Sequence, residues 1–95
     1  MTSAERRYLS VVQALGCIVC RNTFGLATPA EIHHIRTGYG VSQRAPHHET
    51  LPLCPRHHRT GGPGVAFHAG PEQWQSKFGD EIALLEQTRR EASSI

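Results

Sequence analysis

Apolar residues repeat at helical spacing near the N-terminus of the chain. Four of them define one face of a helix: Tyr8, Val11, Val12 and Leu15. Thr2 and Glu5 have the spacing of a capping box at a helix start, and Gly16 suits a helix end. The pattern predicts an N-terminal helix over residues 1–16.

A second apolar stripe lies near the C-terminus. Its members step by four, four and three residues: Trp74, Phe78, Ile82 and Leu85. The stripe predicts one helix over residues 71–92, which Gly79 weakens from within. We expect this helix to pack against the first helix or against the strands.

Short extended segments are predicted between the two helices. The run "EIHHIR" at residues 31–36 favours a strand, because β-branched residues surround its two histidines. The run "TLPLC" at residues 50–54 predicts a second strand. Pro55 suits the first position of a short helix over residues 55–60, which "GGPG" at residues 61–64 ends. The fold class expected is therefore α+β.

The length of the chain and its cysteine content limit the number of domains and the ways in which the fold can be stabilised. With 95 residues it forms one small domain, residues 1–95, whose core is marginal without disulfides or a structural metal. Three cysteines cannot close a set of disulfides, and we find neither a secretory signal nor a membrane-spanning stretch. We expect a cytoplasmic monomer without a membrane partner, whose cysteines bind a metal in a reducing compartment.

Charge is distributed unevenly along the chain. Residues 1–60 carry seven arginines and three glutamates, a net charge of +4, whereas residues 61–95 carry three cations and five acids, a net charge of −2. A polyanion such as DNA would bind the positive part. The alternative is a solvated surface with uneven charge and no such partner.

The cysteines belong to two ligand pairs of equal spacing, Cys17-x-x-Cys20 and Cys54-x-x-His57. A two-residue gap lets both side chains of a pair reach one ion, and two pairs complete a tetrahedron. Three sulfurs and one nitrogen are a usual ligand set for structural zinc. The alternative is that Cys17 and Cys20 are merely small buried residues.

Histidines outside this group also occur in adjacent positions. His33 and His34 are neighbours on a predicted strand, so their side chains point to opposite faces. His58 follows the zinc ligand and is free for another role. One histidine of the doublet can bind a second metal while the other acts as a base, a combination suited to phosphodiester hydrolysis.

The order of these motifs resembles that of the HNH nucleases. It runs from Cys-x-x-Cys to a histidine doublet, a turn, and "LPLC" leading into Cys-x-x-His-His. More narrowly, residues 17–79 are similar to the nuclease domain of the phage Ref family of RecA-dependent nucleases. The resemblance implies a ββα-metal (His-Me finger) core over residues 17–70, which the structural zinc would stabilise. The helices predicted over residues 1–16 and 71–92 would flank this core.

The resemblance also implies a role for each histidine. His33 would bind the catalytic metal and His34 would be the general base. His58 would be the next ligand. Many HNH helices carry a further ligand one turn later, where this chain has Gly62, so we expect His68 to be the third ligand. The ion itself stays open among Zn²⁺, Mn²⁺, Ni²⁺, Co²⁺ and Mg²⁺.

The chain departs from the HNH pattern at its middle asparagine, which braces the loop carrying the base. Asn22 is the only asparagine and lies beside the zinc pair. His47 is our candidate for the bracing role, with His48 and Glu49 behind it. The alternative is that His47 and His48 are exposed loop residues.

Four arginines flank the expected site and suit contacts to DNA phosphates: Arg36, Arg44, Arg56 and Arg59. No base-reading helix is recognisable, so we expect little sequence preference. The sequence thus predicts a phage-encoded, metal-dependent DNA endonuclease, with a requirement for a RecA filament left open. The alternative function is a non-catalytic zinc module that binds nucleic acid or a protein partner.

Overall fold

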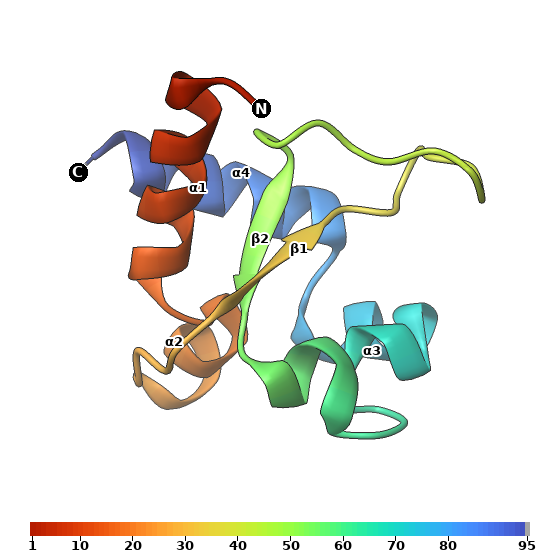
Figure 1. Ribbon diagram of the computed structural model, residues 1–95. Coiled ribbons are helices and arrows are strands. Elements are labelled where there is room, and N and C mark those ends of the chain that lie inside the picture. Colours follow the sequence, from red (N-terminus) through yellow and green to blue (C-terminus); the bar gives the residue numbers. More distant parts are fainter. Residues whose placement is uncertain (95) are drawn as a thin grey trace.

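A two-stranded antiparallel sheet lies at the centre of the fold, with helices around it (Figure 1). The computed structural model describes residues 1–94. In chain order its helices and strands are α1 (Ser3–Leu15), α2 (Ile18–Phe24), β1 (Glu31–His34), β2 (Thr50–Leu53), η1 (Arg56–Thr60), η2 (Phe67–Ala69), α3 (Pro71–Phe78) and α4 (Glu81–Ser93). Helices α1 and α4 pack against each other and against β2, whereas α3 packs on η2. The observed α+β class agrees with the sequence prediction.

The predicted start and end of the first helix are confirmed. The Glu5 N–H donates to Thr2 Oγ1 at 3.0 Å, and the Thr2 N–H donates to Glu5 Oε1 at 2.7 Å, which completes the capping box. Gly16 ends the helix with a φ of 83°, a conformation that glycine adopts without strain. Helix α2 begins two residues later, so the Cys17–Cys20 pair lies at a helix start.

The strands pair in a register that separates the two members of the histidine doublet. His33 pairs with Leu51 and His34 with Thr50. His33 is buried, with 1% of its surface exposed, whereas His34 is partly exposed. The two imidazoles therefore occupy different surroundings although they are neighbours in sequence. All four residues of β2 are buried because helices cover it on several sides.

The prediction of one helix over residues 71–92 was wrong at its middle. Gly79 has a φ of 121°, which ends α3, and Asp80 occupies the N-cap position of α4 without a side-chain hydrogen bond to that helix. The chain changes direction there, so the expected stripe is divided between two helices. Trp74 and Leu85 are buried, but Ile82 is 37% exposed and lies outside the core.

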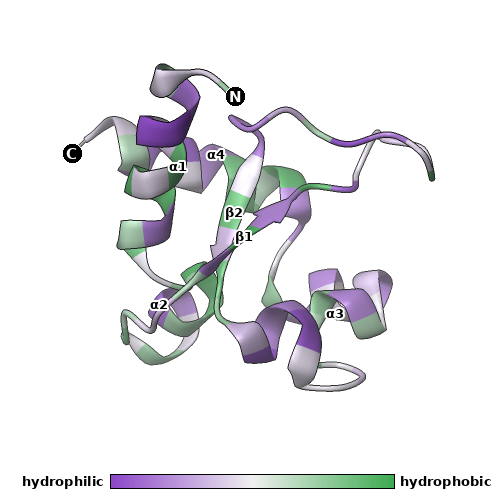
Figure 2. Cartoon of the chain, in the orientation of Figure 1, coloured by the Kyte–Doolittle hydropathy of each residue, from purple (hydrophilic) through white to green (hydrophobic). Residues whose placement is uncertain are grey.

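The core joins the cysteines to the aromatic residues of the C-terminal part. One buried cluster contains all three cysteines together with Leu51, Leu53, Phe67 and Trp74. The Trp74 indole N–H donates to the His57 carbonyl at 3.0 Å, so α3 is bonded directly to η1. In Figure 2 the hydrophobic residues gather around α2 and β2, while the connection between the strands is largely hydrophilic. Within residues 1–94, no helix has the length and apolar character needed to span a membrane.

Candidate metal centre and histidine site

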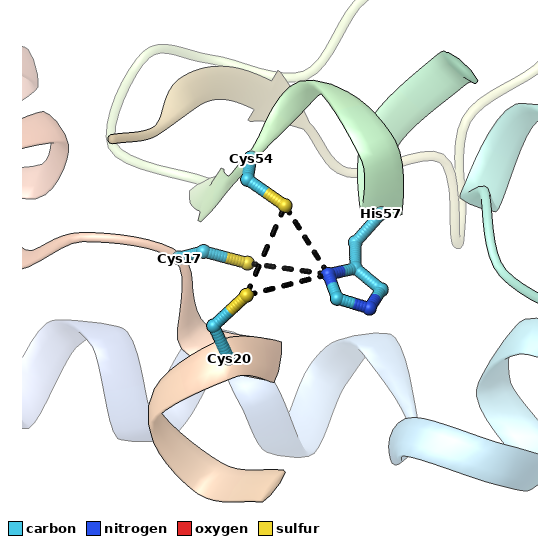
Figure 3. A group of neighbouring side chains, drawn as sticks. All are labelled: Cys17, Cys20, Cys54 and His57. Atoms are coloured by element: carbon cyan, nitrogen blue, oxygen red, sulfur yellow. Dashed lines mark hydrogen bonds between the residues drawn. The ribbon is translucent and has the colours of Figure 1, made fainter. Parts of the chain in front are cut away.

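The four predicted zinc ligands come together in the buried core. Cys17 precedes α2, Cys20 lies in its first turn, Cys54 follows β2 and His57 lies in η1. Their ligand atoms all lie within 4.8 Å of one another (Figure 3). The Cys20 and Cys54 Sγ atoms are 3.9 Å apart, and His57 Nδ1 lies 3.2 to 3.8 Å from the three sulfurs.

These distances fit a tetrahedral metal ion. Usual zinc bond lengths place two sulfur ligands about 3.8 Å apart and a sulfur and a nitrogen about 3.6 Å apart. Burial raises the pKa of the Cys17 thiol to about 11, so a thiolate at this position needs a cation beside it. The group can therefore hold a metal such as zinc, and that ion would tie α2 to the end of β2 and to η1.

A second cluster forms from the three histidines predicted to bind the catalytic metal. His33 comes from β1, His58 from η1 and His68 from η2, and their nearest ring nitrogens lie within 4.8 Å of one another. His33 is buried, His58 is partly buried and His68 is exposed, so the cluster opens to solvent on the His68 side. The structure thus brings together residues that are far apart in sequence, since His33 and His68 are separated by 35 positions.

Hydrogen bonds around this cluster decide which of its ring nitrogens are free for a cation. His58 Nδ1 lies 2.9 Å from Glu31 Oε1. Hydrogen bonds from Arg59 and His58 lower the pKa of Glu31 to about 2, so the ionised carboxylate accepts a hydrogen bond from the His58 Nδ1–H. The lone pair of a neutral His58 is then on Nε2, which lies 3.1 Å from His68 Nε2. Either the His68 Nε2–H donates a hydrogen bond to His58 Nε2 or a cation binds both nitrogens. Two nitrogen ligands of one zinc ion would lie about 3.3 Å apart.

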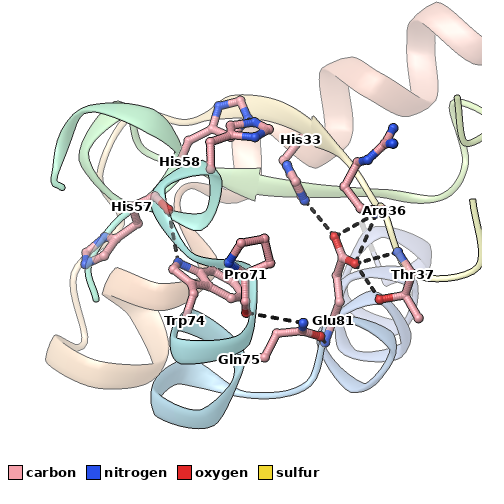
Figure 4. A network of polar contacts seen from close by, with 10 residues as sticks. His33, Arg36, Thr37, His57, His58, Pro71, Trp74, Gln75 and Glu81 are labelled. Carbon is pink, nitrogen blue, oxygen red and sulfur yellow. Dashed lines mark hydrogen bonds and ion pairs between the residues drawn. The ribbon is translucent and has the colours of Figure 1, made fainter. Parts of the chain in front are cut away.

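The sequence did not indicate a fully buried carboxylate beside His33. Glu81, the first residue of α4, lies 2.7 Å from His33 Nε2 and also accepts hydrogen bonds from Arg36 and Thr37 (Figure 4). Burial alone would raise the pKa of Glu81, but the hydrogen bonds from His33, Thr37 and Arg36 together hold it below its usual value. Its position after the break at Gly79 and Asp80 was the only available signal, and the prediction of a continuous helix obscured it.

His34 faces a different set of partners. Its Nε2 lies 3.0 Å from His47 Nδ1 and 3.3 Å from Arg44 Nη2. Burial and the Arg44 charge lower the pKa of His34 to about 4, so its imidazole is neutral at pH 7. The structure therefore places the predicted base beside the predicted bracing residue.

The other residues considered for bracing lie elsewhere. Asn22 exchanges hydrogen bonds with Gln87 on α4. The His48 carbonyl accepts a hydrogen bond from Arg89, and Glu49 accepts one from the Tyr39 hydroxyl at 2.6 Å. These contacts fix the connection between the strands, whereas His47 alone of this group contacts His34.

The four predicted DNA-binding arginines differ in how they are held. Arg36 donates to the carbonyls of Gln43 and Gly40, and Arg59 forms an ion pair with Glu31. Within residues 1–94, Arg44 is exposed and its side chain has hydrogen-bond contacts with the His34 ring alone, while Arg56 is exposed and its side chain has none. Arg44 and Arg56 therefore have the cationic groups most available to a phosphate.

Gly61 is closely packed at the end of η1, the helix that carries one histidine of each cluster. A substitution there tests whether both clusters need the observed position of η1. A Cβ at Gly61 would lie 2.5 Å from the Arg56 carbonyl oxygen and from Val65 Cγ1, so η1 must shift to admit it. We expect Gly61→Ala to cost about 1–3 kcal/mol of unfolding free energy. It should also weaken metal binding, since η1 carries His57 and His58.

Thermal unfolding and metal content of Gly61→Ala should be compared with those of Gly40→Ala. At Gly40 a Cβ would meet only the Gln43 side chain, at 3.6 Å or more. Equal stability of the two variants would contradict the expected crowding at Gly61.

Together these features define a small α+β protein with a buried Cys3His group fit to hold a metal ion. A family described as "Recombination enhancement, RecA-dependent nuclease" matches residues 1–92. The chain therefore belongs to the RecA-dependent nuclease family, which confirms the family predicted from the motifs. No curated protein matches the chain.

Proposed function

We propose that this protein is an HNH-type, metal-dependent DNA endonuclease, encoded by a phage, that hydrolyses phosphodiester bonds. The observation that carries the proposal is the convergence of His33, His58 and His68 at one point, with His34 adjacent in sequence and paired with His47. A purely structural zinc module has no use for this second histidine cluster. Membership in a nuclease family supports the same class of reaction.

In this proposal the three clustered histidines hold a divalent ion. When bound, the ion supplies Lewis-acid stabilisation of the phosphate and of the leaving oxygen. The chain itself supplies the base. If His34 Nε2–H donates to His47 Nδ1, the lone pair of His34 lies on Nδ1 and can take a proton from water. The water oxygen then bonds to phosphorus as one P–O ester bond breaks, and the leaving oxygen takes up a proton from a second water molecule.

The Arg44 side chain has two alternative partners in the proposed cycle, the His34 ring and a DNA phosphate. Without DNA its Nη2 lies 3.5 Å from His34 Nδ1, where it competes with water for the base. A DNA phosphate would attract the guanidinium away from this ring because an anion is the better partner. Substrate binding would thereby free the nitrogen that accepts the proton.

A plasmid-nicking assay tests the proposed function. The zinc-containing protein is treated with a chelator mild enough to leave the Cys3His ion in place and is then given Zn²⁺, Mn²⁺, Ni²⁺, Co²⁺ or Mg²⁺ singly. Each reaction is run with and without a RecA–DNA filament. We expect cleavage to return with at least one metal. DNA binding without cleavage under every condition would instead favour the non-catalytic zinc module.

Binding to DNA should be electrostatic and almost independent of sequence. We expect affinity to fall steeply with salt, and Arg44→Ala should reduce the salt slope by about one ion because one phosphate contact is lost. Arg59→Ala removes the same charge but a guanidinium that Glu31 already pairs, so its slope should change less. The slopes are measured by fluorescence anisotropy with a labelled duplex. Salt-independent binding, or equal slopes for Arg44→Ala and wild type, would contradict this assignment.

A further inference from the structure

Glu81 is a charged residue in an unusual position. Its side chain is 0% exposed, although the residue lies on α4, outside the ββα-metal core expected over residues 17–70. A buried carboxylate is costly unless several donors satisfy it. Four donors do so here: His33 Nε2 at 2.7 Å, Thr37 Oγ1 at 2.7 Å, the Thr37 N–H at 2.9 Å and the Arg36 N–H at 3.0 Å.

The contact with His33 determines which ring nitrogen is free. Two of the donors to Glu81 are backbone N–H groups, which cannot accept a proton and therefore favour the ionised carboxylate. An ionised carboxylate only accepts hydrogen bonds, so His33 Nε2 carries the proton. The lone pair of His33 is then on Nδ1, which becomes the atom available to a cation.

The contacts with Arg36 and Thr37 fix a second part of the site. These two residues begin the connection between β1 and β2, and they follow the strand after Ile35. Because Glu81 takes their N–H groups, the chain leaves the sheet at this point. The connection then carries Arg44 and His47, which contact His34 on the other face of β1.

We propose that Glu81 is a positioning residue that leaves His33 Nδ1 as the free ligand atom of the three-histidine cluster and anchors the connection that carries Arg44 and His47. The proposal rests on the proposed function, in which this cluster binds the catalytic metal. It makes α4 part of the site, since a carboxylate 48 residues from His33 sets the orientation of that ligand. Carboxylates that accept the second ring N–H of a metal-binding histidine raise its basicity and fix its tautomer.

A solely structural role for Glu81 predicts a different outcome. The carboxylate would then stabilise the turn and the start of α4, and its loss would lower stability without changing the histidine. Thr37→Val is the matched control, because it removes one donor to Glu81 and leaves the His33 contact in place. The two variants separate loss of stability from loss of ligand orientation.

Metal titration tests the effect on the cluster. With zinc retained at the Cys3His group, Co²⁺ is titrated into wild type, Glu81→Gln and Thr37→Val, and its visible absorption bands and binding heat are measured. We expect the dissociation constant for Co²⁺ to rise by about 10–100-fold in Glu81→Gln and to stay at the wild-type value in Thr37→Val. Wild-type Co²⁺ affinity in folded Glu81→Gln would overturn the proposal, as would an equal loss in both variants.

The tautomer of His33 gives a second readout that needs neither a second metal nor activity. Long-range ¹H–¹⁵N correlation spectra of ¹⁵N-labelled wild-type protein, with only the structural zinc bound, should show His33 protonated at Nε2. A His33 protonated at Nδ1 would overturn the proposal even if Glu81→Gln failed to fold. If wild type bound no Co²⁺ at the cluster and cut no DNA, the proposed function would fail, and the tautomer would still decide whether Glu81 orients His33.

Discussion

Removal of zinc from the Cys3His group is expected to unfold the protein. Structural zinc contributes on the order of 10–16 kcal/mol of binding free energy, whereas a whole domain is usually stable by about 5–15 kcal/mol. In this chain the ion would join α2, the end of β2 and η1 within one buried cluster. Without the ion, no metal bonds join these three segments, and three thiols and an imidazole are left buried in the core. Cys20→Ala should have the same effect as chelation, because it removes one of the four ligands.

Adjacent histidines offer the matched comparison for this prediction. His57 lies in the Cys3His group and its neighbour His58 lies in the other cluster. Far-UV circular dichroism and thermal unfolding should show His57→Ala largely unfolded and His58→Ala folded, with zinc retained in His58→Ala. Elemental analysis that found no zinc in cleanly folded wild type would refute the prediction.

Short-range patterns predicted the parts of the fold that depend on neighbouring residues. The capping box of Thr2 and Glu5 and the glycine stop at Gly16 act within one helical turn, so three-residue spacing suffices to recognise them. The strands were predicted slightly too long, over residues 31–36 and 50–54. The first ends early because Glu81, far away in sequence, takes the N–H of Arg36.

The candidate site was predictable only where its residues lie in motifs. Equal ligand spacing pointed to the Cys3His group, and the family resemblance pointed to His33, His34, His58 and His68. The structure brings the three predicted ligands together, and their binding of a catalytic ion stays a prediction. Glu81 was missed because its partner is 48 residues away and because the prediction of a continuous helix hid the break just before it. The ion pair of Arg59 with Glu31 was missed for the same reason.

The two members of the histidine doublet should fail in different ways when each is replaced by alanine. His34→Ala removes the proposed proton acceptor and leaves the His33 cluster intact. Metal and DNA binding should therefore survive, while the cleavage rate falls by roughly two to four orders of magnitude, the usual range for loss of a general base. His33→Ala removes one of three proposed ligands, so the affinity for the second metal should fall and a high metal concentration should restore part of the activity.

Both variants are compared with wild type by metal titration and by nicking rate on one plasmid, and the structural zinc content should be the same in all three. The opposite faces of β1 make this comparison possible, because His33 is buried against Glu81 and Phe67 whereas His34 contacts His47 and Arg44. A wild-type cutting rate in His34→Ala would exclude His34 as the base. Loss of the second metal from His34→Ala, with retention in His33→Ala, would mean that the two roles belong to the opposite members of the doublet.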